Sequence, residues 1–129
     1  MKNTALMALF ILGGTLAFSA DPVPYDKAAA KDIMHANIAA IDTVNKAMAA
    51  QDWEAVASGF MQFAQNAQKA RQFAPPKGDA KEWARIWDDF LFAAYRGVGA
   101  AGDKDAVKAK AALDQIIGER NAGHPQFKG

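Results

Sequence analysis

Cysteine is absent from this 129-residue sequence, which excludes disulfides, thiolate metal sites and cysteine nucleophiles. Charge of one sign is also scarce, because 15 Lys and Arg residues are interleaved with 14 Asp and Glu residues, so we predict no nucleic-acid partner. Two histidines make a multi-histidine zinc site improbable. No Gly-rich phosphate loop, zinc-protease helix or catalytic carboxylate pair stands out, and we therefore predict that the protein is not an enzyme.

A long apolar run occurs only at the start of the sequence. Lys2 precedes an apolar stretch over residues 5–18, and the small residues Ser19 and Ala20 separate it from a polar segment. This pattern is typical of a secretory signal peptide and is too short and too weakly flanked for a membrane-spanning helix. We predict a signal peptide over residues 1–20, with cleavage after Ser19 or after Ala20 left open.

The remaining residues, 21–129, are enough for one small domain. The signal predicts export to a bacterial periplasm, with no membrane contact once the signal is removed. A domain of this size needs an unusually regular core or a bound cofactor to be comfortably stable.

Few alternating β-branched runs occur in the domain, and its apolar residues recur instead at steps of three and four, which predicts an all-α structure. We expect four helices, over about 26–50, 52–73, 79–97 and from Asp103 or Asp105 to about 127. Pro75 and Pro76 must end the second helix because both lack an N–H, and Asp79 with Glu82 can cap the third. The short connections predict an up-down-up-down antiparallel four-helix bundle.

The helical spacing also predicts which side chains face the core. We expect Gly97, Gly99 and Gly102 to end the third helix. The predicted core stripes are, in chain order, Met34, Ile38, Ile41 and Met48; Trp53, Val56, Phe60, Phe63, Ala67 and Ala70; and Trp83, Trp87, Phe90 or Leu91, and Ala94.

The predicted topology brings one set of distant residues to a single end of the bundle: Met34, Phe73, Trp83, Trp87, Arg120 and His124. A flat apolar ring fits between helices there, with Met34 and His124 approaching it from opposite faces. Imidazole nitrogen and thioether sulfur are strong-field ligands of haem iron that leave no open position, and the thioether favours ferrous iron. The pattern therefore predicts a haem centre suited to electron transfer.

The C-terminal sequence carries a family resemblance. Residues 120–128, Arg-Asn-Ala-Gly-His-Pro-Gln-Phe-Lys, resemble the closing Arg-Asn-Ala-Tyr-His-Gln-Lys-Tyr-Arg of the cytochrome b562 family, a group of four-helix bundles. Residues 109–116 are similar without a gap, residues 74–77 (Ala-Pro-Pro-Lys) resemble Thr-Pro-Pro-Lys of its second loop, and residues 32–34 (Asp-Ile-Met) resemble its Asp-Asn-Met. Gly123 replaces an aromatic residue of the family pattern, and Pro125 follows His124 directly, so we expect the last helix to kink or end at His124.

The resemblance implies one haem b per chain, with Met34 and His124 as the iron ligands. It places Trp83 and Trp87 on two phenylalanines that line the family's haem pocket. Because there is no cysteine, the haem would be non-covalent. Arg120 lies one turn before His124 and can pair with a haem propionate, although a surface ion pair is an equal alternative. The implied function is a periplasmic one-electron carrier with a periplasmic redox partner, and a monomer or weak dimer is expected.

Each candidate residue also has an ordinary structural interpretation. Met34 alone reads as a core methionine, His124 as an exposed residue at a helix end, and His35 as a surface residue about 100° around the helix from Met34. The main alternative function is a haem-free bundle that serves as a periplasmic interaction or stress module. In a third possible function the protein keeps haem, Met34 dissociates from the iron, and the protein binds a gas or another small ligand.

Overall fold

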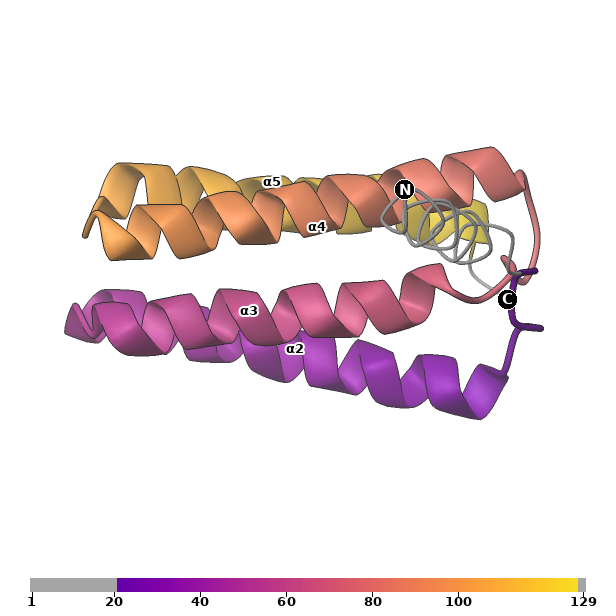
Figure 1. The fold of residues 1–129 in the computed structure, drawn as a ribbon, viewed down its shortest axis with the longest axis horizontal. Coiled ribbons are helices and arrows are strands. Elements are labelled where there is room, and N and C mark those ends of the chain that lie inside the picture. The colour runs from indigo at the N-terminus through magenta and orange to yellow at the C-terminus, as the bar shows by residue number, and fades with distance from the viewer. Residues whose placement is uncertain (1–20, 128–129) are drawn as a thin grey trace, which may run out of the picture.

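The computed structural model describes residues 21–127, so the predicted signal peptide lies outside the described residues. Four helices follow one another along this part of the chain: α2 (Lys27–Ala50), α3 (Trp53–Arg71), α4 (Ala80–Gly102) and α5 (Ala106–Phe127) (Figure 1). The predicted all-α four-helix bundle is confirmed. None of these helices combines the length and the apolar character that crossing a membrane requires.

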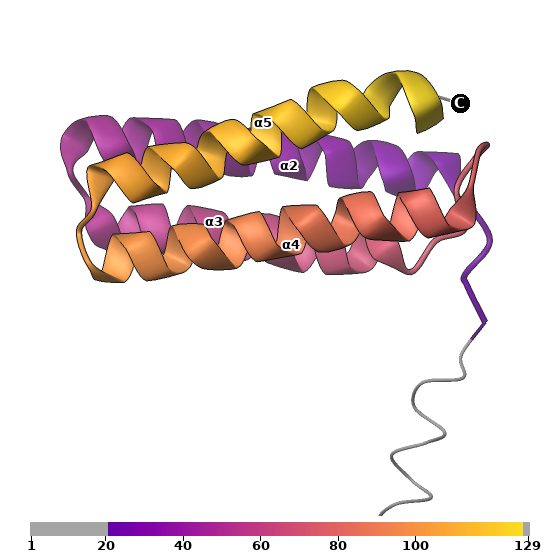
Figure 2. The same ribbon diagram turned by 90° about the horizontal axis from the view of Figure 1, so that it is seen from above.

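The bundle has two layers, with α2 and α3 in one and α4 and α5 in the other (Figure 1). Viewed from above, α5 and α2 lie along one side and α4 and α3 along the other (Figure 2). Consecutive helices pack closely on one another, whereas α2 and α5 form the most sparsely packed side. We call the end of the bundle at which α2 begins and α5 finishes the terminal end; α3 ends and α4 begins there as well.

An aspartate starts each of the four helices α2 to α5. Its carboxylate oxygen accepts hydrogen bonds of 2.9–3.1 Å from backbone N–H groups of the first turn, and these residues are Asp26, Asp52, Asp79 and Asp105. The choice left open between Asp103 and Asp105 therefore falls on Asp105. Glu82 does not complete a capping box, because its carboxylate binds Arg85 instead.

The predicted end of the third helix at Gly97 is wrong, since α4 continues to Gly102. Gly97 is buried because α3 approaches α4 closely: a Cβ atom built there would lie 2.5 Å from ring atoms of Phe60. A helical glycine costs about 1 kcal/mol of backbone entropy relative to alanine. Here that cost is offset by packing, so glycine marks a close contact between helices and not a helix end.

Of the two outcomes expected at His124, a kink or an end of the last helix, the end is wrong, because α5 runs through Pro125 to Phe127, as the predicted bound of about 127 has it. Within a helix, proline removes one hydrogen bond to the carbonyl four residues back, and here only Asn121 is affected. Phe127, beyond the proline, is 8% exposed. Burying its ring favours one more helical turn.

The predicted core stripe is correct for α3, where Val56, Phe60, Phe63, Ala67 and Ala70 are all buried and Trp53 is half-buried. On α4, Phe90 and Ala94 are buried, with Trp83 and Trp87 half-buried at its start.

The stripe predicted for α2 is wrong in its first two members, because Met34 is 48% and Ile38 is 55% exposed. The helix buries Ala40, Val44 and Ala47 instead, and a Cβ atom on Gly59 of α3 would lie 2.7 Å from Val44 Cγ2. Small residues thus face α3, and Met34 lies about 120° around the helix from Ala40.

Candidate functional site

The candidate residues come from three helices at the terminal end. Met34 lies in the third turn of α2, Trp83 and Trp87 lie in the first turns of α4, and Arg120 and His124 lie in the last two turns of α5. Met34 and His124 are both exposed. Neither side chain has a hydrogen-bond or ion-pair partner within residues 21–127, so the sulfur and the ring nitrogens are available for bonding. Their role as iron ligands stays a prediction.

Trp83 and Trp87 belong to a continuous row of aromatic rings at the terminal end. Trp83 contacts Trp87 edge to face at a centroid distance of 5.5 Å, and Trp87 contacts Phe90 at 5.1 Å. Phe90 in turn contacts Phe63 of α3 at 5.6 Å. On the outer side Trp83 meets Phe127 of α5 at 5.1 Å. These five rings, of Phe63, Trp83, Trp87, Phe90 and Phe127, form what we call the aromatic wall of the terminal end.

Phe127 belongs to this wall but is not among the candidate site residues predicted from the sequence. A signal for it exists, because Phe127 follows Ile116 and Gly123 on one face of α5 at helical spacing, and all three are buried.

Backbone contacts hold the wall in place. The N–H of Val23 donates to the carbonyl of Gln72, and the N–H of Ala74 donates to the carbonyl of Val23, both at 2.8 Å. The indole N–H of Trp83 donates to the carbonyl of Phe73 at 2.9 Å. The chain before α2 and the loop after α3 are thus tied to each other and to α4.

Three buried polar atoms near this end have no hydrogen-bond partner among the described residues: Asn37 Oδ1, Asn66 Nδ2 and Trp87 Nε1. Asn66 is 7% exposed. Gly59 of α3 lies against Val44 of α2, so these two residues are at the same level of the bundle. Asn66 follows Gly59 by seven residues and Asn37 precedes Val44 by seven, so both asparagines lie about two turns closer to the terminal end. A buried polar group without a partner costs about 1–3 kcal/mol, so this interior favours a bound water or ligand with polar atoms.

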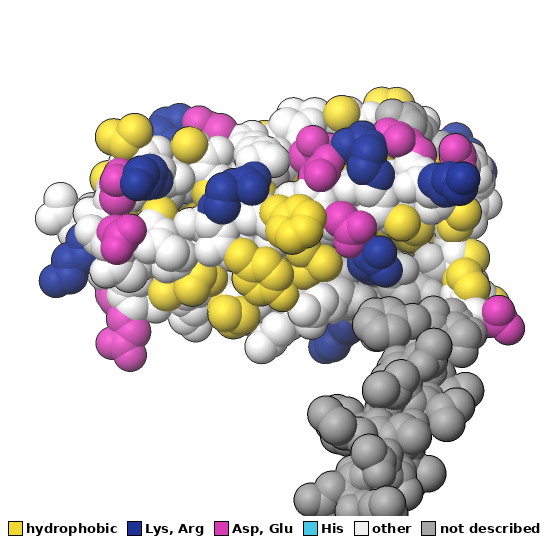
Figure 3. Space-filling view, turned by 45° about the horizontal axis from the view of Figure 1, so that its top comes forward, with side chains coloured by type: hydrophobic (Ala, Val, Ile, Leu, Met, Phe, Trp, Pro, Cys, Tyr) yellow, Lys and Arg dark blue, Asp and Glu magenta, His cyan; other side chains and the backbone are white. Residues whose placement is uncertain are grey.

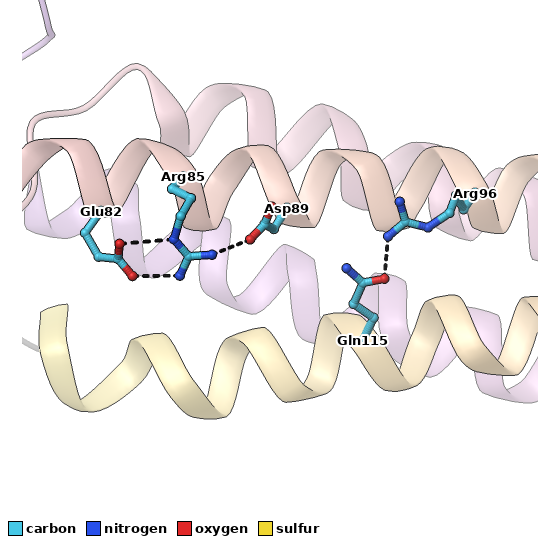
Figure 4. Close-up of polar contacts among 5 residues, drawn as sticks. All are labelled: Glu82, Arg85, Asp89, Arg96 and Gln115. Atoms are coloured by element: carbon cyan, nitrogen blue, oxygen red, sulfur yellow. Dashed lines mark hydrogen bonds and ion pairs between the residues drawn. The ribbon is translucent and has the colours of Figure 1, made fainter.

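Most arginines here are paired, but Arg120 is not. Arg85 binds Glu82 at 2.6 Å and Asp89 at 2.5 Å (Figure 4), and the hydrogen bond from Arg85 lowers the pKa of Glu82. Arg71 binds Asp88 at 2.5 Å, which raises the pKa of Arg71. Arg120 is exposed and pairs with no carboxylate in the described part of the chain. Its guanidinium is therefore free to bind an anionic group beside His124.

Protein ligands for a simple metal ion do not gather in residues 21–127, where no group of three or more His, Cys, Asp and Glu side chains is found together. A Met–His pair contributes only one such residue, so this finding does not bear on a haem iron. His35 is exposed, next to Met34 on α2.

The chain matches no protein-family model, no curated protein and no solved structure in comparisons with each.

Proposed function

We propose that this protein is a periplasmic b-type cytochrome that carries single electrons, with one non-covalent haem b at the terminal end. One observation carries the proposal: the confirmed up-down topology brings a methionine of the first helix and a histidine of the last helix to the same end. These two helices, α2 and α5, also form the sparsely packed side of the bundle. A flat ring can enter there with the least loss of existing contacts.

The residues present fit such a group. The Met34 thioether and the His124 imidazole are unpartnered and are a known ligand pair for haem iron. Trp83 and Trp87 supply an aromatic surface with one unpartnered indole N–H, on Trp87. The free guanidinium of Arg120 suits a propionate, since an arginine fork matches a carboxylate.

When bound, haem supplies a one-electron iron couple, and a Met/His ligand pair leaves no iron position open to a substrate. In this proposal Met34 and His124 would hold the iron, and the thioether sulfur of Met34 would favour the reduced state. Trp83 and Trp87 would pack against the ring, and Arg120 would pair with a propionate at the surface. A periplasmic redox protein is the expected partner.

The similarity of residues 120–128 to the cytochrome b562 family supports the proposal, and Gly123, where the two differ, has a structural explanation. Gly123 is buried, and a Cβ atom there would lie 3.2 Å from Ile86 Cδ1. An aromatic side chain would require α5 and α4 to separate. Glycine instead lets the last turn of α5 lie close to α4.

The test is a titration of hemin into mature protein prepared without haem, followed by visible spectroscopy and potentiometry. We expect stoichiometric binding with sharp low-spin bands on reduction and complete extraction of the haem by acid acetone. Met34→Leu should leave a five-coordinate or water-ligated iron with a lowered potential. His124→Ala should weaken binding strongly.

The matched control is His35→Ala, which removes an exposed imidazole next to Met34. It should leave the spectrum and the potential unchanged. Absence of saturable binding, or equal binding by His124→Ala and the unsubstituted protein, would contradict the proposal.

A haem-free interaction module is the second candidate, and a surface feature favours it. Three large apolar side chains are exposed on α3 and α4: Met61 at 40%, Phe92 at 59% and Tyr95 at 43%. Apolar side chains cluster on this face in Figure 3, and the Tyr95 hydroxyl accepts a 2.8 Å hydrogen bond from Gln68 across the two helices. Exposed apolar patches of this kind often bind other proteins. If hemin does not bind in the titration, the haem-free interaction module is the function that remains.

A further inference from the structure

A cavity of about 330 Å³ opens between α4 and α5 in the half of the bundle away from the terminal end. Its walls carry four polar or charged side chains, Arg96, Asp103, Lys108 and Gln115, and its remaining lining consists of glycine and alanine. The volume falls at the lower end of the range for small-molecule sites.

The cavity exists because small residues face each other across the two helices. A Cβ atom built on Gly99 would meet nothing within 4 Å. Alanines of α4 and α5, among them Ala111, complete an apolar lining without filling the space. A ligand bound here would therefore rest its apolar part on methyl groups and bare backbone.

The polar side of the cavity has unused cationic donors. The Arg96 guanidinium donates to the neutral amide oxygen of Gln115, reaching from α4 toward α5 (Figure 4). It has no carboxylate partner among residues 21–127, unlike Arg71 and Arg85. Four of the five guanidinium N–H donors remain for a ligand once one is used.

Lys108 supplies a second cation, since its ammonium lies 3.9 Å from the Asp105 carboxylate, a loose pairing. Asp103 supplies one negative charge to the wall, so the lining carries a net charge of one positive unit, with the Asp105 carboxylate outside the lining beside Lys108. This balance favours a singly charged anion over a polyanion. The backbone N–H groups in the first turn of α5 contribute little to anion binding, because the Asp105 carboxylate already accepts the N–H of Lys108 at 3.0 Å.

We propose that this cavity binds a small organic monoanion. Its carboxylate lies between Arg96 and Lys108, and its apolar body covers the alanine and glycine lining. The Gln115 amide can rotate away from Arg96 and donate to the same carboxylate. This site is separate from the proposed haem site, and its occupancy does not depend on haem.

The experiment is a titration of the ¹⁵N-labelled mature protein, at constant ionic strength, with sodium benzoate as the monoanion. Benzyl alcohol serves as the neutral analogue of the same shape, and inorganic phosphate as an anion without an apolar body. We expect saturable amide shifts confined to residues 96–103 and 106–115, with benzoate binding about tenfold more tightly than either comparison compound.

Three variants distinguish binding in this cavity from general effects on the protein. Arg96→Gln should weaken benzoate binding about tenfold, whereas Arg71→Gln, which removes an exposed and paired arginine, should leave it unchanged. Ala111→Leu should block binding by filling the cavity while keeping both cations, so the proposal stays testable if Arg96→Gln disturbs the fold. Shifts that remain linear with concentration, phosphate binding as tight as benzoate, or Ala111→Leu binding as well as the unsubstituted protein would overturn the proposal.

Discussion

Replacing Gly97 by alanine adds one methyl group at a close contact between α3 and α4. The new Cβ would lie 2.5–2.6 Å from three ring atoms of Phe60, including Cγ, the atom that attaches the ring. Phe60 is 0% exposed, so its ring has no solvent-filled space into which it can move. The two helices must separate or the ring must leave its preferred rotamer.

Two opposing contributions determine how much Gly97→Ala changes the free energy of unfolding. Alanine is favoured over glycine inside a helix by about 1 kcal/mol. Overpacking a tight core costs about 1–3 kcal/mol, and we expect the upper part of that range because the contact involves the base of the ring. Gly97→Ala should therefore lower the free energy of unfolding by about 1–2 kcal/mol. Gly99→Ala, two residues away on the same helix with nothing within 4 Å, should raise it by about 0.5–1 kcal/mol.

The assay is urea denaturation of the haem-free protein followed by far-UV circular dichroism, with thermal melting as a second measurement. A difference of about 1.5–3 kcal/mol should separate the two variants, and each kcal/mol corresponds to roughly 4 °C in melting temperature for a domain of this size. If Gly97→Ala were as stable as Gly99→Ala, the close contact between α3 and α4 would be refuted.

Three further predictions concern the aromatic wall, the buried amides and an ion pair. Phe127→Ala should lower the free energy of unfolding by about 3 kcal/mol by removing a buried ring; a loss under about 1 kcal/mol in urea denaturation would show that the last turn does not pack. Asn66→Leu should stabilise the haem-free protein by about 1 kcal/mol, because it removes an unpartnered donor; destabilisation by that much would mean that the amide binds a partner. The hydrogen bond from Arg85 lowers the pKa of Glu82 from its ordinary 4.5 in the folded state, so its stabilisation is present above about pH 4.5 and is lost as the pH falls through the folded value. The melting difference between Glu82→Gln and the unsubstituted protein should therefore shrink on acidification, and a difference that persists would contradict this assignment.

Much of the fold follows from local signals. Aspartates before each helix and the two prolines after α3 act within a few residues, so they mark boundaries without knowledge of the tertiary structure. The predicted helix ends at Gly97 and at His124 were wrong because the local tendencies of Gly97 and Pro125 were each outweighed by a distant contact. For Gly97 that contact is with Phe60, and for Pro125 it is the burial of Phe127 beyond it.

The candidate site, too, was predictable from the sequence only in part. The end of the bundle that holds Met34 and His124 follows from helix order alone, because short connections force consecutive helices to be antiparallel. The exposure of Met34 did not follow, because helical spacing allows several residues of an apolar helix to face the core. The close approach of Gly59 to Val44 decides that Ala40 and its neighbours face α3.

The sequence by itself thus determined four helices, their order and the end at which the candidate ligands lie, and it left the cap of the last helix open between Asp103 and Asp105. Periodicity and capping are properties of neighbouring residues, and short loops restrict the topology. Only the tertiary structure decided which face α2 buries, whereas helical spacing had predicted the buried face of α3. It also decided that Gly97 and Gly123 are packing contacts, that Phe127 closes the aromatic wall and that a cavity opens beside Arg96. These features depend on distances between side chains far apart in the chain, and such distances arise only when the helices pack together.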